Sequence, residues 1–168
     1  MIQNIIIING NPESADNTLT SFLFDTVVHL KESGFSTIYH SLSEKEIKSC
    51  VGCWDCWWKT PGICRHKDDA PQLLKDMINS DLVLFSSPMI MGMYSALLKT
   101  FHDRIIPLIH PYIEIRDGEN HHKKRYPKYP KMGVILENGD SLVEEIENVK
   151  FILDRMAINF HSEIKIFK

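Results

Sequence analysis

The sequence has no apolar run as long as the roughly 18 residues that a membrane-spanning helix needs. It also has no excess of one charge, since 19 Lys and Arg face 22 Asp and Glu, for a net charge of −3. A general nucleic-acid binder would be strongly basic, so we expect neither a nucleic-acid nor a membrane partner. No positive charge precedes the short isoleucine run at the N-terminus, so we expect no secretory signal and a cytoplasmic location.

Cysteine is scarce and unevenly placed. The only four, Cys50, Cys53, Cys56 and Cys64, follow a C-x2-C-x2-C-x7-C pattern. A disulfide framework would spread cysteines through the chain, so clustering favours a metal, a cluster or redox chemistry. Three cysteines at this pitch can wrap one side of an iron–sulfur cubane, and the fourth can close it. Zinc and unmetallated thiols are the alternatives.

Strand-like and helix-like segments alternate along the chain. Apolar, β-branched runs predict strands at 4–8, 35–41, 81–86, 131–136 and 161–167. Helical spacing predicts helices at 18–31, from 69, at 95–106 and from a capping box at 141–144. Repeated βαβ units predict an α/β, flavodoxin-like three-layer sandwich in one domain, 1–168, with five parallel strands in the order 2-1-3-4-5. A Cys/Trp-rich loop, 44–67, and an irregular basic loop, 116–131, complete it.

Ligands of such sheets bind where the strands end, which directs attention to two loops. The loop from Asn9 to Thr18 joins a buried strand to a helix N-terminus, where free N–H groups and the helix dipole make an anion site. The alternative is an ordinary turn that caps the helix with Asn17 or Thr18. The segment 87–94 is apolar and methionine-rich, and can hold a planar ligand or simply line the core.

These segments carry a resemblance. CVGCWDCWWKTPGIC, then KDD, then SSP…GMYSALLKTFHDR resemble the NAD(P)H-dependent FMN reductase and iron–sulfur flavoprotein group of flavodoxin-like proteins, from about Ile5 to Leu136. The resemblance implies bound FMN, reduction by a nicotinamide nucleotide, NAD(P)H, and electron transfer to a small acceptor such as a quinone or a flavin. It also makes a [4Fe-4S] cluster on the four cysteines a hypothesis.

The same resemblance implies the residues of the site. The FMN phosphate would be held by Gly10, Asn11, Pro12, Ser14, Asn17 and Thr18. The isoalloxazine ring would lie along Pro88, Met89, Ile90, Met91 and Gly92, and Asn138 and Gly139 would complete the site. No general acid or base stands out, so catalytic residues are left unassigned.

Three positions depart from the family pattern. Glu13 stands where the family often has Arg, and Asp16 where it often has Gly, so two acids lie near a phosphate dianion. Ile90 and Met91 replace an aromatic pair that would stack on the ring. These departures keep a flavin-free binding or regulatory protein as one alternative. An electron carrier with an iron–sulfur cluster is the other.

Two further features concern partners. The segment 116–131 carries six basic and two acidic residues, which fits either recognition of nucleotide phosphates or a solvated or docking loop. Flavodoxin-like chains usually continue with a helix after the fifth strand, whereas this sequence ends at Phe167-Lys168. We therefore expect the final helix to be missing and a second subunit, in a homodimer or larger homo-oligomer, to cover the exposed face.

Overall fold

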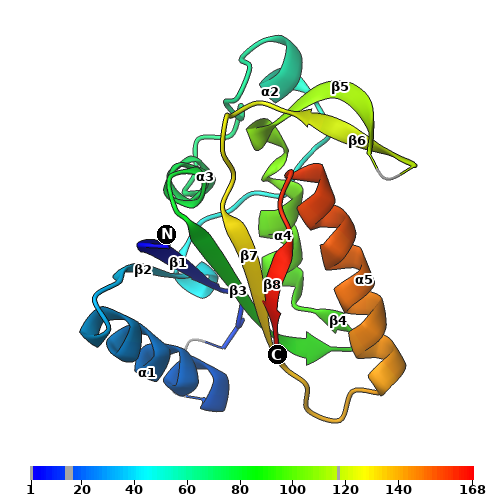
Figure 1. Ribbon diagram of the computed structural model, residues 1–168. Coiled ribbons are helices and arrows are strands. Elements are labelled where there is room, and N and C mark those ends of the chain that lie inside the picture. The colour runs from blue at the N-terminus through cyan, green and yellow to red at the C-terminus, as the bar shows by residue number, and fades with distance from the viewer. Residues whose placement is uncertain (1, 14–16, 117) are drawn as a thin grey trace.

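A computed structural model describes residues 2–13, 17–116 and 118–168 (Figure 1). Its elements are β1 (Asn4–Asn9), α1 (Thr18–Glu32), β2 (Ser36–Ser41), the 3-10 helix η1 (Leu42–Glu44), α2 (Asp55–Trp58), α3 (Ala70–Ile78), β3 (Leu82–Ile90), β4 (Met93–Tyr94), α4 (Ala96–Asp103), the 3-10 helix η2 (Ile106–Leu108), β5 (Ile109–Arg116), β6 (Glu119–Lys124), β7 (Lys131–Glu137), α5 (Val143–Asn159) and β8 (Ile164–Phe167). Within these ranges, none of the helices combines the length and the apolar character needed to cross a membrane.

The central sheet has the predicted order. Its strands run β2-β1-β3-β7-β8, all parallel, which is 2-1-3-4-5 when the main strands are numbered along the chain. The short β4 adds a sixth strand by pairing antiparallel with the end of β3. β1 lies between two strands and is buried on both faces, which explains its unbroken isoleucine run.

Helices cover the two faces of the sheet unequally. On one face, α1 packs Leu19, Leu23 and Val27 against alternate sheet residues such as Ile7 and Leu84. On the other face, α3, α4 and α5 pack against the larger core of the molecule. α4 crosses this face from the end where β4 lies to the end that carries α2, η2 and the β5–β6 hairpin (Figure 1). The expectation of a second subunit stays a prediction.

The prediction of an irregular loop at 116–131 is wrong in its first half. β5 and β6 form an antiparallel hairpin, with Ile113 opposite His122. The hairpin is docked on α5, because the Asn159 side chain accepts a hydrogen bond from the His122 N–H at 3.1 Å. The sequence of β6 is polar and therefore does not predict a strand. Its histidines contact another element instead of forming an apolar stripe.

Several element boundaries also differ from prediction. β8 begins at Ile164 instead of His161. β3 continues to Ile90 instead of ending at Ser86, because its last residues pair with β7 and β4. α4 ends at Asp103, and a 3-10 turn follows at Pro107. α5 begins one residue late: Glu145, not Glu144, accepts the hydrogen bond from the Leu142 N–H, at 2.8 Å.

A buried ion pair holds the base of the cysteine loop. Asp68 receives two hydrogen bonds from the Arg104 guanidinium, at 2.6 and 3.0 Å, and both side chains are almost completely buried. The Lys48 N–H donates to Asp68 at 3.0 Å, and Arg104 donates to the Lys48 carbonyl at 2.5 Å. The two ends of the long loop are therefore fastened to each other and to the end of α4.

Burial acts to raise the pKa of Asp68, but the Arg104 hydrogen bonds and the backbone N–H groups of Lys48 and Ala70 outweigh it and hold that pKa below its usual range. A depressed folded-state pKa means that the stabilisation is fully present above the unfolded pKa, near 4, and is lost as the pH falls through the folded value.

We predict that Asp68→Asn lowers the free energy of unfolding by about 3–5 kcal/mol at neutral pH, because it leaves the buried Arg104 charge without its carboxylate. Urea denaturation measures this loss, which should begin to shrink below about pH 4, where the unfolded carboxyl becomes protonated, and should disappear only below the depressed pKa of the native carboxyl. The control is Asp103→Asn, whose exposed pair with Lys99 should contribute less than about 1 kcal/mol. Equal effects of the two substitutions would contradict the role given to Asp68.

Candidate functional site

The loop after β1 rests directly on α4. The Gly10 N–H donates to the Ser86 carbonyl at 2.7 Å. A Cβ atom at Gly10 would lie only 2.6 Å from the Leu98 Cβ, closer than two such atoms can approach. Glycine is therefore required here by packing, and this contact sets where the loop lies.

Asn11, one of the predicted phosphate-binding residues, is turned inward. Its N–H donates to the Asn9 side chain at 3.0 Å, and its amide group contacts the Thr20 hydroxyl at 3.3 Å. The Asn11 side-chain carbonyl oxygen accepts a hydrogen bond from the Glu13 N–H at 3.1 Å. In this conformation Asn11 shapes the loop, and its polar groups are already engaged. Pro12 is exposed beside it.

The start of α1 lies where the sequence predicts an anion site. Asn17 is the N-cap and accepts from the Thr20 N–H at 2.9 Å. The first N–H groups of a helix have no partner within it, which leaves those of Thr18 and Leu19 for a ligand. The exposed carboxylate of Glu13 lies 3.3 Å from the Asn17 amide nitrogen, at the same helix end. Ser14 and Asp16 lie outside the described residues.

The predicted apolar loop after β3 is a β-hairpin. Met89 pairs with Tyr94 and Ile90 with Met93, so Met91 and Gly92 form a two-residue turn. Their φ angles of 51° and 77° are those of a type I′ turn. The side chain of Met91 is 99% exposed, although methionine is apolar and seldom adopts positive φ. The hairpin tip therefore presents an apolar surface at this edge.

Serine side chains join the two loops. Ser95, the N-cap of α4, donates its hydroxyl to the Gly10 carbonyl and accepts from the Leu98 N–H at 3.1 Å. Its own N–H donates to the Ser87 hydroxyl at 2.8 Å, which fixes the base of the hairpin. Neither serine was predicted as a site residue. The N-cap pattern of Ser95 before an apolar helix was the signal available for it.

Asn138 and Gly139 follow β7 at the same edge. Since Pro88 pairs with Glu137, Asn138 comes directly after the residue opposite the hairpin base. Both are exposed, and Gly139 has a φ of 54°, in the left-handed region that favours glycine. The Ser141 N–H closes this turn on the Asn138 carbonyl at 3.0 Å. The Asn138 side chain makes no hydrogen bond with the other two loops in the part of the chain that is described.

The cysteine loop lies at the other end of α4. Cys50, Cys53, Cys56 and Cys64 all line one small cavity, together with Arg65 and the buried Arg104. Cys56 is buried, whereas Cys50 and Cys53 are exposed. Burial, reinforced by the neighbouring cysteines, raises the pKa of Cys56 to about 11, so its unligated thiol is protonated at neutral pH. The fold therefore gathers the four thiols that the sequence spacing grouped.

Trp57 anchors this loop to the body of the protein. Its indole N–H donates to the Ile106 carbonyl at 3.1 Å, and its ring stacks on Trp54 with centroids 4.7 Å apart. On its other side, Trp57 packs against His122 of the hairpin, with ring centroids 5.1 Å apart. Trp54 itself has a φ of 60°, which turns the backbone into α2 and buries Cys56.

The donor set of this cavity fits a thiolate-ligated metal centre in its chemistry. Four cysteines surround one space, and the Arg104 Nε is buried there without a hydrogen-bond partner. Among the residues that the structure describes, however, no three or more His, Cys, Asp or Glu side chains stand in a metal-binding arrangement.

A doubly wound parallel sheet with the strand order β2-β1-β3-β7-β8 and helices on both faces defines a flavodoxin-like protein. The chain belongs to the family of NADPH-dependent FMN reductases, which it matches over residues 3–125.

Curated relatives include iron–sulfur flavoproteins. One from Methanocaldococcus jannaschii is 36% identical over 104 residues, which is 62% of this chain and 52% of the relative. Another, from Archaeoglobus fulgidus, is 34% identical over 101 residues, 60% of this chain and 44% of the relative. The chain thus spans about half the length of the curated relatives it matches.

Solved structures share the fold at low identity. A flavone reductase superposes with a TM-score of 0.66 at 14% identity, covering 99% of this chain and 54% of the other. An NAD(P)H:quinone oxidoreductase from Methanothermobacter marburgensis also has a TM-score of 0.66, at 13% identity, covering 99% and 86%. These similarities confirm the flavodoxin-like fold.

We predict that Glu13→Gln tightens FMN binding about three- to five-fold, because it removes a negative charge from the helix end where the phosphate dianion would sit. Flavin fluorescence quenching measures the dissociation constant. Asp25→Asn removes the same charge about two helical turns further along α1 and should change it little. The assignment of the phosphate to this helix start would be contradicted if Glu13→Gln had no effect or acted like Asp25→Asn.

Proposed function

We propose that the chain is an FMN-dependent oxidoreductase that passes electrons from a nicotinamide nucleotide to a small acceptor such as a quinone or a flavin. The observation that carries this proposal is the Ser95–Gly10 hydrogen bond. It joins the anion site of α1 to the apolar hairpin of β3 and β4, so that one ligand with a phosphate and a planar ring can reach both. Membership of the FMN reductase family supports the same ligand.

Different residues would bind the phosphate and the ring of FMN. The N–H groups of Thr18 and Leu19 would receive the phosphate, with Asn17 holding the helix start in place. Ile90 and Met91, on the exposed hairpin tip, would contact the ring. Bound FMN supplies the hydride and electron chemistry, so the chain's own part is to orient the ring and control access to it.

The first test is flavin uptake and reduction. The protein incubated with FMN should retain the yellow flavin through gel filtration, and NADPH or NADH should bleach it without oxygen. Met91→Asp should weaken FMN binding about ten-fold, because it places a charge against the apolar ring, while the turn remains acceptable to Asp. Val51→Asp, at another exposed apolar position, on the cysteine loop, should leave FMN affinity unchanged.

A colourless protein that takes up no FMN would refute the oxidoreductase proposal and favour the flavin-free binding protein. If the protein retains flavin but neither NADH nor NADPH reduces it, the proposed FMN site would stand and the proposed electron donor would be refuted. Equal loss of affinity in the Met91 and Val51 variants would contradict the position given to the ring.

The second candidate is an iron–sulfur flavoprotein that carries electrons through a [4Fe-4S] cluster. The gathering of all four cysteines around one cavity favours it, as do the curated relatives named iron–sulfur flavoproteins. In that case Cys50, Cys53, Cys56 and Cys64 would hold the cluster as thiolates, and Cys56 would release its proton on binding.

Anaerobically prepared protein should then contain iron and acid-labile sulfide at about four each per chain, as the cubane requires. Cys53→Ser should abolish the iron content, whereas Val51→Ala in the same loop should preserve it. Iron that persists in the Cys53 variant would exclude this ligand set, and zinc in place of iron would identify the alternative metal.

A further inference from the structure

A large cavity lies away from the proposed flavin site. Its volume is about 570 Å³, within the range of ligand pockets. Asn79 and Lys128, which line it, come just before β3 and β7 begin, so the cavity lies at the edge opposite the flavin loops. None of the residues assigned to FMN contributes to it.

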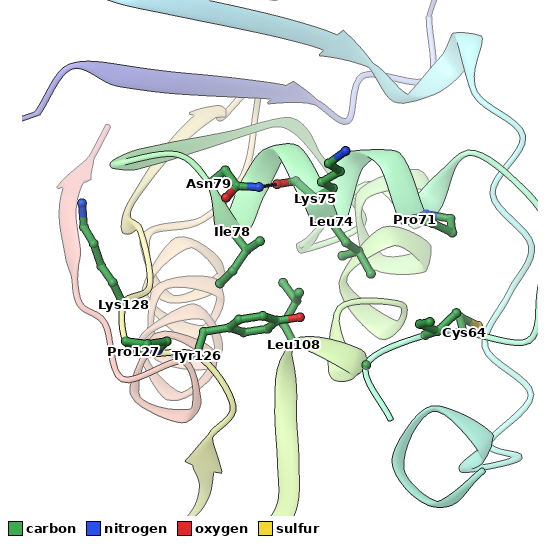
Figure 2. Close-up of a pocket in the computed structure, with 12 residues that line it drawn as sticks. Cys64, Pro71, Leu74, Lys75, Ile78, Asn79, Leu108, Tyr126, Pro127 and Lys128 are labelled. Atoms are coloured by element: carbon green, nitrogen blue, oxygen red, sulfur yellow. Dashed lines mark hydrogen bonds between the residues drawn. The ribbon is translucent and has the colours of Figure 1, made fainter. Parts of the chain in front are cut away.

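The walls of this cavity are apolar, and one of them is flat. Leu74 and Ile78 of α3 point toward the Tyr126 ring, which forms the facing wall, with Leu108 between them (Figure 2). Tyr129 holds the backbone at Tyr126 through its hydroxyl group, at 3.4 Å, and packs edge-on against its ring. A fixed aromatic ring opposite aliphatic side chains is a surface on which another planar ring can stack.

The charge around the cavity is positive. Two lysines, Lys75 and Lys128, line it, and no acidic residue does so among those described. Lys128 is neutralised by its ion pair with Asp81, whereas Lys75 is exposed on α3 and makes no ion pair within the described ranges. Its ammonium group points away from Tyr126 in Figure 2, so the side chain would have to change rotamer to reach a ligand stacked on that ring.

A second cation borders the opposite side. The Arg125 Cδ lies 3.7 Å from where a Gly62 Cβ would be, and Gly62 lines the cavity. Arg125 donates one hydrogen bond to the Ile109 carbonyl at 3.2 Å, but its Nε is buried without a partner in the described chain. An apolar interior with unneutralised cations on its borders favours an amphipathic anion over a neutral or cationic ligand.

We propose that this cavity is a second ligand site, which binds a planar aromatic anion of two or three fused rings. The rings would stack on Tyr126 between Ile78 and Leu108, with the charged group at the mouth near Lys75. Cys64 lines both this cavity and the small cavity of the four cysteines, so the ligand would lie beside the thiol cluster. The proposal does not depend on bound FMN.

The test compares two probes of one shape, naphthalene-2-sulfonate and its neutral analogue naphthalene-2-sulfonamide, by titration calorimetry at low salt. The sulfonate should bind more tightly than the sulfonamide. Lys75→Glu should weaken sulfonate binding about five-fold or more, and leave the sulfonamide unchanged. Lys31→Glu, the same charge change on α1 across the sheet, is the control and should have no effect.

Ile78→Trp should fill the cavity and abolish binding of both probes, with urea denaturation confirming that the variant is folded. The proposal is overturned by absence of binding at about 1 mM probe, by full binding to the Ile78 variant, or by equal loss in the Lys75 and Lys31 variants. Each titration is repeated with saturating FMN. Displacement of the probe by FMN would place it at the flavin loops, and would also overturn the proposal.

Failure here is distinguishable from failure of the proposed function. A protein that binds FMN but not the sulfonate retains the oxidoreductase proposal and loses this site. A protein that binds the sulfonate but takes up no FMN retains this site and loses the oxidoreductase proposal.

Discussion

The buried ion pair between Asp68 and Arg104 is the constraint on which the cysteine-loop end of the molecule depends. It closes the base of a long loop that contains little regular structure of its own, apart from the short α2. Removing two charges from water costs free energy that offsets much of their mutual attraction, so such a pair adds little net stability. Its value is specificity, because only one arrangement satisfies both charges and the Lys48 backbone together.

α4 connects the end of the molecule that holds this ion pair to the opposite edge of the sheet. Its N-cap, Ser95, holds Gly10 and the hairpin base, while Arg104 at its far end faces the cysteine cavity. Eight helical residues span only about 12 Å, yet they separate two sites of different chemistry. The edge proposed to bind the flavin phosphate is built from backbone N–H groups and small residues. The opposite edge is built from thiols, aromatic rings and arginines.

Glu13 shows how a family site can be altered without changing its frame. The loop turn, the N-cap and the Gly10 contact are all in place, although Glu13 contacts both Asn11 of the turn and the N-cap Asn17. The carboxylate sits at the positive end of the α1 dipole, where it offsets part of the charge that would attract a phosphate. The fold therefore keeps the geometry of an anion site, while one side chain adjusts its strength.

The sequence by itself determined the order of the main strands, the helices between them and an N-cap at Asn17 or Thr18. The helices and the cap follow from periodicity and from interactions a few residues apart, and the strand order follows from the repeated βαβ units. The sequence also grouped the four cysteines. Tertiary structure alone decided that Arg104 pairs with Asp68 and not with the adjacent Asp103, since successive side chains on a helix point in different directions. The same holds for the hairpin of β5 and β6, which Asn159 of α5 supports, and for the large cavity between α3 and Tyr126. Each of these depends on side chains far apart in the chain, and only the packing of the sheet and helices brings such side chains together.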